Sequence, residues 1–315
     1  MISLNSAKTF IKLNLVLWAI GHAFMGIYNL TLSASFGFMY LIFLVLMYAY
    51  LLAKNHFILN FLEYSVREVQ PIDEAEPPKE KYDHEFDYFI AKDTITDVLA
   101  LMIVNTSGVY YMDSIFWDLL LFIPKTFLLE VVFDFFHYWA HRICHHRKLY
   151  WIHKTHHAHQ HPKGITVFYQ DPLDLIINNV IPFFLASHII SLSVYQMALF
   201  VPYKTFIEVS GHLGRRLYPI SSFSQFIWLP RLLGIEIYSE DHDAHHTKIK
   251  YNFSKRFTLW DRVFGTFKRL DKTTEKIEKS NKIQIENTKY SEYSPTKIWV
   301  SLFVMIFIYL ISFYF

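Results

Sequence analysis

Long runs without charged side chains alternate with short, strongly charged segments along this chain. Residues 13–53 contain no Asp, Glu, Lys or Arg, and this run of 41 residues is about twice as long as a bilayer-spanning helix needs. It predicts a helical hairpin, with helices near Leu13–Thr31 and Phe36–Ala53 and a turn at Ser33–Ser35. A signal peptide is the alternative for the first helix, but no small-residue cleavage site follows it.

Three later runs lack Lys and Arg: residues 93–124, 164–203 and 298–315. They predict a second hairpin that turns near Met112–Ser114 and continues to His141, a third over Leu173–Val209 that turns near Ser191–Ser193, and a final apolar helix, Ile298–Phe315. The connecting segments carry nearly all the Lys and Arg, so the positive-inside rule places them in the cytoplasm. A soluble protein with buried apolar helices is the alternative, but 41 uncharged residues exceed an ordinary pair of core helices.

These patterns divide the chain into five parts. Residues 1–54 form an N-terminal transmembrane hairpin, 55–94 a cytoplasmic polar connector with an exposed loop over Pro71–Glu85, and 95–268 the region that holds every clustered histidine. Residues 269–296 are a flexible polar segment, and 297–315 a C-terminal apolar helix. We therefore expect an integral, multi-pass membrane protein, in the endoplasmic reticulum if eukaryotic and in the inner membrane if bacterial.

Composition agrees with a membrane protein and excludes several classes of function. Hydrophobic residues make up 53% and charged residues 18%, against roughly 45–50% and 25% in soluble proteins. The net charge of +2 gives no electrostatic case for binding nucleic acid. The single cysteine, Cys144, excludes an intrachain disulfide, a zinc finger and a thiolate-bound iron–sulfur cluster.

Nine of the 17 histidines form three clusters. In the first, on a helix predicted over Phe127–His146, the spacing i, i+4, i+8 places the rings on one stripe. The second and third clusters both read His-x-x-His-His, in which i, i+3 and i+4 converge on one helical face, and the adjacent pair can reach two different ions. All three follow membrane helices on the same side. The clusters are His137, His141 and His145; His153, His156 and His157; and His242, His245 and His246.

So many imidazoles predict two metal ions with open coordination positions. Imidazole suits Zn, Cu, Fe and Ni, whereas a structural zinc site closes with four ligands. Two adjacent redox metals at a membrane boundary suggest oxygen activation. A metal transporter is disfavoured because only His22 and His188 lie within spans, and a non-catalytic metal-binding membrane protein stays open. Nearby carboxylates are expected to accept hydrogen bonds from the ligand rings: Asp134, Glu208, Asp241, Asp243 and Asp261.

The histidine region resembles the fatty acid hydroxylase/sterol desaturase superfamily over about Val131–Lys268, nearly half the chain. The resemblance is specific in the order and spacing of its motifs. These are Tyr138-Trp139-Ala140-His141-Arg142-Ile143-Cys144-His145, then His153-Lys154-Thr155-His156-His157, Gly211-His212, Asp241-His242-Asp243-Ala244-His245-His246, Asn252-Phe253, and Trp260-Asp261-Arg262-Val263-Phe264-Gly265-Thr266.

The resemblance implies a ligand set for the metals. The family places an Arg directly after its first ligand, so Arg142 marks His141 and then His145 as the first box, and His137 becomes a ligand or a supporting residue one turn deeper. His212 matches an isolated histidine between the second and third boxes. Arg216 stands where some relatives carry one more histidine. The implied ligands are His141, His145, His153, His156, His157, His212, His242, His245 and His246.

The resemblance also implies fold and activity: an all-α protein whose transmembrane helices are capped by a cytoplasmic helical region holding a histidine-rich dimetal site. Residues 95–268 would then be the catalytic domain of a non-haem di-iron oxidoreductase that uses O2 to hydroxylate or desaturate a lipid. The Trp-Asp-x-x-Phe-Gly-Thr tail favours the sterol desaturase-like branch; a fatty acid, sphingolipid or alkylglycerol hydroxylase is the alternative.

Electrons for such a reaction are expected from a separate reductase or electron-transfer protein. The chain lacks a Gly-rich dinucleotide fingerprint, and His161-Pro162-Lys163-Gly164 is too weak to count as a haem motif. The expected partners are therefore the lipid or sterol substrate, the membrane and this electron donor.

Overall fold

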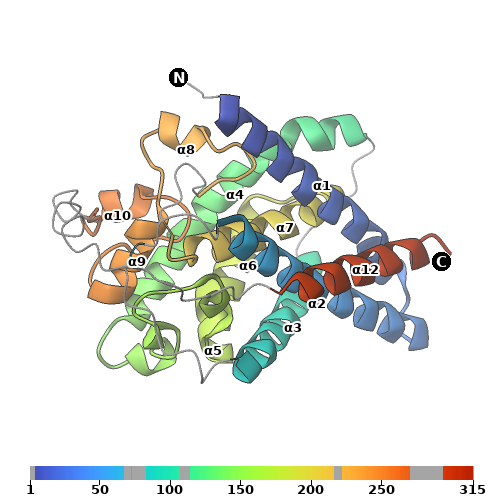
Figure 1. Ribbon diagram of the computed structural model, residues 1–315, viewed down its shortest axis with the longest axis horizontal. Helices are drawn as coiled ribbons and strands as arrows, with labels where there is room; N and C mark the ends of the chain where they lie inside the picture. Colours follow the sequence, from blue (N-terminus) through green and yellow to red (C-terminus); the bar gives the residue numbers. More distant parts are fainter. Residues whose placement is uncertain are drawn as a thin grey trace.

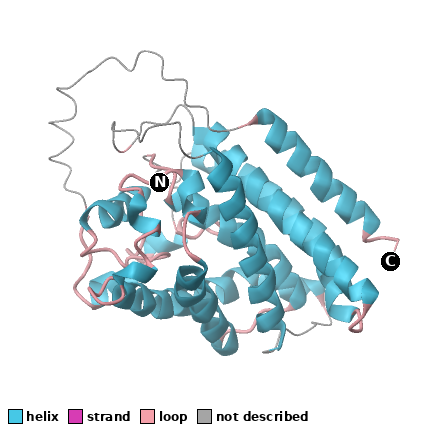
Figure 2. Ribbon diagram, turned by 90° about the horizontal axis from the view of Figure 1, so that it is seen from below, coloured by secondary structure: helices cyan, strands magenta, loops and turns pink. Residues whose placement is uncertain are grey.

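The computed structural model describes residues 4–66, 72, 83–106, 114–215, 222–269 and 294–314. Within these ranges the chain is helical and contains no β-strand (Figure 2). The long helices are α1 (Leu4–Ser33), α2 (Phe38–Val66), α3 (Asp83–Thr106), α4 (Ile115–Cys144), α7 (Val194–Gly211) and α12 (Pro295–Ile311). The shorter ones are η2 (Tyr150–Ile152), η3 (His156–Ala158), η4 (Gly164–Phe168), α5 (Pro172–Leu175), η5 (Ile176–Val180), α6 (Ile181–Ile189), α8 (Leu229–Leu232), α9 (Ser239–Lys248) and α10 (Leu259–Val263).

Among the described residues, three helical segments are long and apolar enough to cross a membrane: Ala7–Ser33 in α1, Phe38–Val66 in α2, and the continuous segment Pro172–Ile189 from α5 to α6. The apolar helix α12 is shorter. Large apolar side chains lie on the outer surface of these helices, for example Leu15 and Val45, each 65% exposed. Such side chains would face lipid rather than water. The first expected hairpin and the first half of the third are therefore candidate spans, whereas α3, α4 and α7, expected as further spans, are not among them.

The predicted turns lie where charge is missing. α1 ends at Ser33 and α2 begins at Phe38, and α6 and α7 are joined through residues 190–193, where the Ser193 hydroxyl caps α7 by accepting the Gln196 backbone N–H. Of the expected turn near Met112–Ser114, residues 112 and 113 lie outside the described residues, and α4 follows from Ile115.

The connector expected over residues 55–94 is helical at both ends: α2, expected to end at Ala53, continues to Val66, and α3 begins at Asp83. Buried polar contacts explain the longer α2. The Lys54 ammonium donates to the Thr205 hydroxyl at 2.7 Å, and the Asn55 amide donates to the Thr94 hydroxyl at 3.0 Å. Of the loop expected over Pro71–Glu85, the structure describes residue 72 and residues 83–85, and the latter three belong to α3 rather than to a loop. Arg216 and residues 270–293 of the expected polar segment lie outside the described residues.

The core lies where α1, α2 and α7 pack together. Tyr50 of α2 is fully buried, and its hydroxyl donates to the Ile20 carbonyl of α1 at 2.6 Å. Gly21 lets α1 approach α7, because a Cβ there would stand 2.8 Å from the Leu199 Cα. α12 lies along α2. In Figure 1, α9 and α10 lie at one side of the molecule, and the ends of α2 and α12 reach towards the other.

Candidate metal centre

The C-terminal end of α4 presents the first histidine cluster as a stripe. The Nε2 atoms of His141 and His145, one turn apart, are 3.2 Å from each other. His137, a further turn back, lies beside His141 with ring centroids 5.1 Å apart, but its Nδ1 donates to the Asn178 carbonyl at 2.5 Å and its ring stacks on Phe133. The structure thus places His137 beside the site, outside both groups of possible metal ligands.

The second cluster does not lie on an α-helix, which corrects the expected helical face. After α4 the chain makes a series of tight turns, so that His153 ends η2 while His156 and His157 form η3. Their adjacent side chains point to different places: the Nε2 of His157 lies 3.2 Å from that of His245, and the Nε2 of His156 lies 3.4 Å from that of His212. Irregular backbone thus gives the divergence that a helix was expected to provide.

The third cluster lies on α9, as expected. The Nε2 of His245 is 3.1 Å from that of His145, whereas the Nε2 of His246 is 3.1 Å from that of His242 on the same helix. α9 ends at Lys248, and the backbone of the next residue, Ile249, has φ 41°, in the left-handed region. This turn brings the Tyr251 carbonyl to the Nδ1 of His245, at 2.7 Å.

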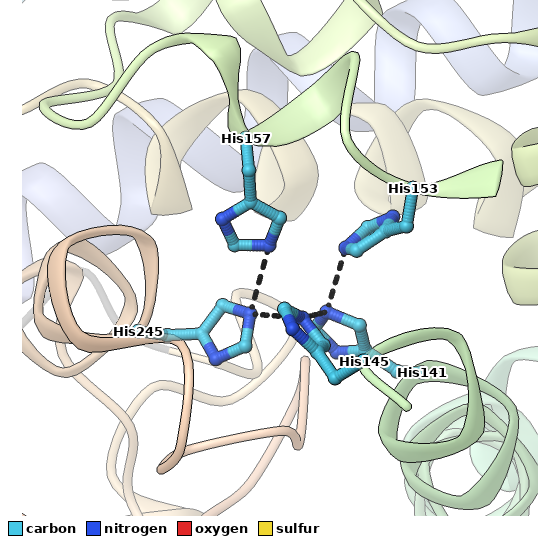
Figure 3. Close-up of side chains that lie close together, drawn as sticks. All are labelled: His141, His145, His153, His157 and His245. Carbon is cyan, nitrogen blue, oxygen red and sulfur yellow. Dashed lines mark hydrogen bonds between the residues drawn. The ribbon is translucent and has the colours of Figure 1, made fainter. Parts of the chain in front are cut away.

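The nine histidines form two groups, each with its nitrogen atoms within 4.8 Å of one another. Figure 3 shows the rings of group A converging from α4, from the turns after it and from α9. Both adjacent pairs, 156–157 and 245–246, are divided between the groups. Group A is His141, His145, His153, His157 and His245, and group B is His156, His212, His242 and His246.

In five of the nine rings the Nδ1 atom donates to an acceptor, which fixes where the proton lies: His141, His153, His212, His245 and His246. The Nδ1 of His141 donates to the Phe253 carbonyl at 2.8 Å, and the Nδ1 of His245 to the Tyr251 carbonyl. Their Nε2 atoms therefore carry lone pairs, and both face the Nε2 of His145, at 3.2 and 3.1 Å. A single N–H on the Nε2 of His145 cannot donate to both lone pairs, so hydrogen bonds among the rings leave at least one nitrogen of group A without a partner. A metal cation would satisfy it.

Group B has the same design. The Nδ1 of His212 donates to the Glu208 carbonyl at 2.9 Å, and that of His246 to the His159 carbonyl at 3.1 Å. The Nε2 atoms of both face that of His242, at 3.0 and 3.1 Å. The donor sets of both groups thus fit metal ions.

Burial keeps these rings in the neutral form that metals bind. It lowers the pKa of His212 and of His245 to about 4. Burial, then neighbouring histidines, lower the pKa of His156 and His246 well below the ordinary value. A cluster of neutral imidazoles at physiological pH follows.

One carboxylate contacts a ligand ring directly, and the sequence analysis missed it. Asp174 is fully buried at the junction of α5 and η5, and its two oxygens accept the Nδ1 proton of His153, at 2.9 and 2.8 Å. Asn178, one turn later, also donates to it, at 2.5 Å. Asp174 lies two residues after Pro172, in the first turn of α5, and nothing in the local sequence pointed towards His153.

Four of the five carboxylates expected beside the rings, Asp134, Glu208, Asp241 and Asp261, make no side-chain hydrogen bond to a ring of groups A or B among the described residues. They bind backbone N–H groups or form ion pairs instead. Asp134 accepts three N–H groups of residues 255–257. Asp261 accepts the N–H groups of Phe253 and Ser254, which places the Phe253 carbonyl on His141. Asp241 accepts the N–H of Tyr238 at the start of α9 and pairs with Arg269.

The Glu208 side chain pairs with Lys204, Lys255 and Arg256, while its backbone carbonyl, not its carboxylate, holds His212. Asp243 contacts His161, outside both groups, at 3.3 Å. These acids therefore hold the loops and helix ends that carry the histidines, rather than the histidine rings themselves.

The fatty acid hydroxylase family model matches residues 126–266, the segment that contains all nine histidines. The chain is 32% identical to methylsterol monooxygenase 1 of Rattus norvegicus over 153 residues, 48% of this chain and 49% of that protein. It is 27% identical to the fatty acid hydroxylase vlmA of Lecanicillium sp over 204 residues, 62% and 55% of the two chains.

A longer match, at 27% identity over 252 residues, joins 76% of this chain to 79% of methylsterol monooxygenase 1 of Gallus gallus. The chain spans about half the length of the first curated relatives it matches. No solved structure matches it. Three observations agree: the order of the histidines, their division into two groups, and these relatives. The histidine-bearing part of the chain therefore belongs to the fatty acid hydroxylase/sterol desaturase superfamily.

Proposed function

We propose that this protein is a membrane-bound, non-haem di-iron oxidoreductase that uses O2 to hydroxylate or desaturate a lipid. The observation that carries the proposal is the division of nine histidines into two groups whose lone pairs converge. The similarity to methylsterol monooxygenases and to a fatty acid hydroxylase supports it. Among lipids, a sterol is favoured by these relatives, with acyl, sphingolipid or alkylglycerol substrates as the alternative.

The residues of the chain would hold two irons, one in each group. Imidazole suits iron, and two irons bound by nine histidines supply the redox chemistry that activates O2. The chain itself does three things. The Phe253, Tyr251, Glu208 and His159 carbonyls and the Asp174 carboxylate orient the rings, burial keeps the rings neutral, and the surrounding helices exclude water.

The overall hydroxylation replaces a C–H bond of the lipid with C–OH. One oxygen atom of O2 enters the alcohol, and the other leaves as water after taking up two electrons and two protons; desaturation instead removes two hydrogens from the lipid. We propose that the electrons come from a separate reductase or electron-transfer protein.

The site would lie at the cytoplasmic face of the membrane. α2 ends on the side of the histidines, where the Glu63 side chain accepts the N–H of Gly164 at 3.1 Å. The turn between α1 and α2 lies at the opposite ends of these helices. Lys and Arg crowd the segments beside the histidines and are missing from the turns, so the positive-inside rule places the histidines in the cytoplasm.

The test is lipid oxidation in membranes that contain the protein. Membranes with the wild-type chain and with His245→Ala receive NADPH, a reductase-bearing membrane fraction and a methylsterol, a long-chain alcohol or a fatty acid. We expect an O2-dependent hydroxylated or unsaturated product with the wild type, at least about a hundredfold above the variant. Absence of such a product for all three lipids, from protein that contains iron, would count against the proposal.

A further inference from the structure

One residue of the chain lies between the two backbone carbonyls that hold rings of group A. The Tyr251 carbonyl accepts the Nδ1 proton of His245 at 2.7 Å, and the Phe253 carbonyl accepts that of His141 at 2.8 Å. The two rings come from α9 and α4, and their centroids are 4.5 Å apart. Asn252 joins the two carbonyl-bearing residues, so its conformation affects the direction of both carbonyls.

The backbone of Asn252 is in the left-handed region, with φ 57°. Among the described residues, the only other non-glycine residue with positive φ is Ile249, three residues earlier in the same turn after α9. Asparagine adopts this conformation more readily than most residues that carry a Cβ. Residues held in such rare conformations cluster at functional sites. The residue type at position 252 therefore bears on how the neighbouring carbonyls point.

The amide of Asn252 is buried, with the residue 1% exposed, and both ends of the amide are hydrogen-bonded. Its Nδ2 donates to the Asp241 carbonyl at 2.9 Å and to the Lys268 carbonyl at 2.7 Å, and its Oδ1 accepts the Lys268 N–H at 2.7 Å. Asp241 lies in the first turn of α9, the helix that carries His245. The side chain thus ties residues 251–253 to the helix that presents one of the two rings.

We propose that Asn252 is a positioning residue of the metal centre, whose left-handed backbone and buried amide direct the carbonyls of residues 251 and 253 onto two ligand rings of group A. The inference rests on the proposed function, because these rings are the proposed iron ligands. Asn252 acts through the two carbonyls and makes no hydrogen bond to a ring among the described residues. The Glu208 and His159 carbonyls hold rings of group B, so the effect of Asn252 should fall mainly on group A.

The experiment measures iron binding by group A in the full-length chain. Asn252→Ala removes the amide and disfavours positive φ, whereas Asn252→Gly removes the amide but adopts positive φ freely. Each is made in the wild type and in His246→Ala, which leaves the five histidines of group A in place. Asn55→Ala is the matched control, because Asn55 is also a fully buried asparagine, and its amide donates to the Thr94 hydroxyl, away from the rings.

We expect Asn252→Ala to bind iron in group A about 10–100-fold more weakly, the usual effect of losing the partners of metal-bound histidines. Asn252→Gly should bind iron about fivefold more tightly than Asn252→Ala, because glycine takes the left-handed conformation without steric cost. Asn55→Ala should lose thermal stability about as much as Asn252→Ala, yet keep its iron affinity within about twofold of its parent. Chelator competition gives the affinities, and thermal unfolding of the iron-free chains gives the stabilities.

Equal losses of iron affinity in Asn252→Ala and Asn55→Ala would overturn the inference, because Asn252 would then act only through the stability of the fold. Unchanged affinity in Asn252→Ala, or affinity in Asn252→Gly as low as in Asn252→Ala, would overturn it as well. The proposed function stands in all three cases. If the wild type itself binds no iron, the proposed function fails, and the inference fails with it.

Discussion

Replacing Asp174 with Asn tests how the site holds its metal. Both carboxylate oxygens of Asp174 lie within 2.9 Å of the His153 Nδ1, and the Nε2 of the same ring faces that of His141 at 2.9 Å. The carboxylate therefore fixes which nitrogen of His153 carries the proton and where the other one points. An asparagine of almost the same shape keeps the volume but loses the charge and places an N–H₂ group where an acceptor is needed.

Two independent magnitudes give the same expected loss of iron affinity. A hydrogen bond to a charged group contributes about 1.5–3 kcal/mol. Removing the partner of a metal-bound histidine typically weakens metal binding by about 10–100-fold, which is about 1.4–2.7 kcal/mol. Asp174→Asn should therefore bind iron about 10–100-fold more weakly, through group A, to which His153 belongs.

Iron retention during competition with a graded series of chelators measures this change. Asp171→Asn is the matched control, because Asp171 lies three residues earlier and accepts from the Thr155 hydroxyl at 2.5 Å rather than from a ring. It should keep its iron affinity within about twofold of the wild type. Size-exclusion chromatography confirms that each variant is folded. Equal iron retention by Asp174→Asn and the wild type would refute the reasoning.

Three further predictions follow from the site and the helices. His156→Ala should abolish lipid oxidation while the chain still inserts into membranes, and full activity of this variant would remove His156 from the ligand set. His137 lies outside both groups, so His137→Ala should keep at least about a tenth of the activity. Because the pKa of His212 is lowered to about 4, the unfolded chain binds more protons than the folded one between about pH 6.5 and 4. The iron-free protein should therefore lose thermal stability as pH falls through that window, and an unfolding midpoint at pH 5 equal to that at pH 7.5 would contradict this. The orientation in the membrane can be tested with single cysteines. Lys154→Cys, next to the second cluster, should react with an impermeant maleimide only when the reagent is on the cytoplasmic side, whereas Phe36→Cys, in the turn after α1, should not react from that side. The reverse pattern would overturn the topology.

The sequence predicted the long helices because a bilayer-length run without charge has few alternatives. It did not predict the end of α2, because Lys54 and Asn55 look like the start of a polar connector. Their partners, Thr205 and Thr94, are 151 and 39 residues away, and only the folded chain shows that these polar groups are satisfied inside the bundle. The pattern of charges alone therefore does not predict where α2 ends.

The histidines themselves were identified from their spacing and from the family resemblance, but their supports were not. Asp174 lies 21 residues from His153, and the carbonyls on His141 and His212 carry no sequence signal, since every residue has one. The division of the second cluster between two groups was expected from a helix, whereas the turns of η2 and η3 produce it. Local patterns thus predicted the histidines that lie in the two groups, while tertiary contacts determine how their rings are held.

The most direct test of the account is the metal content of the chain purified from membranes. We expect two irons per chain in the wild type, and about one in His246→Ala, which alters group B and leaves the five histidines of group A in place. A single tightly bound zinc with no iron in the wild type would contradict the di-iron centre and favour a non-catalytic metal-binding membrane protein.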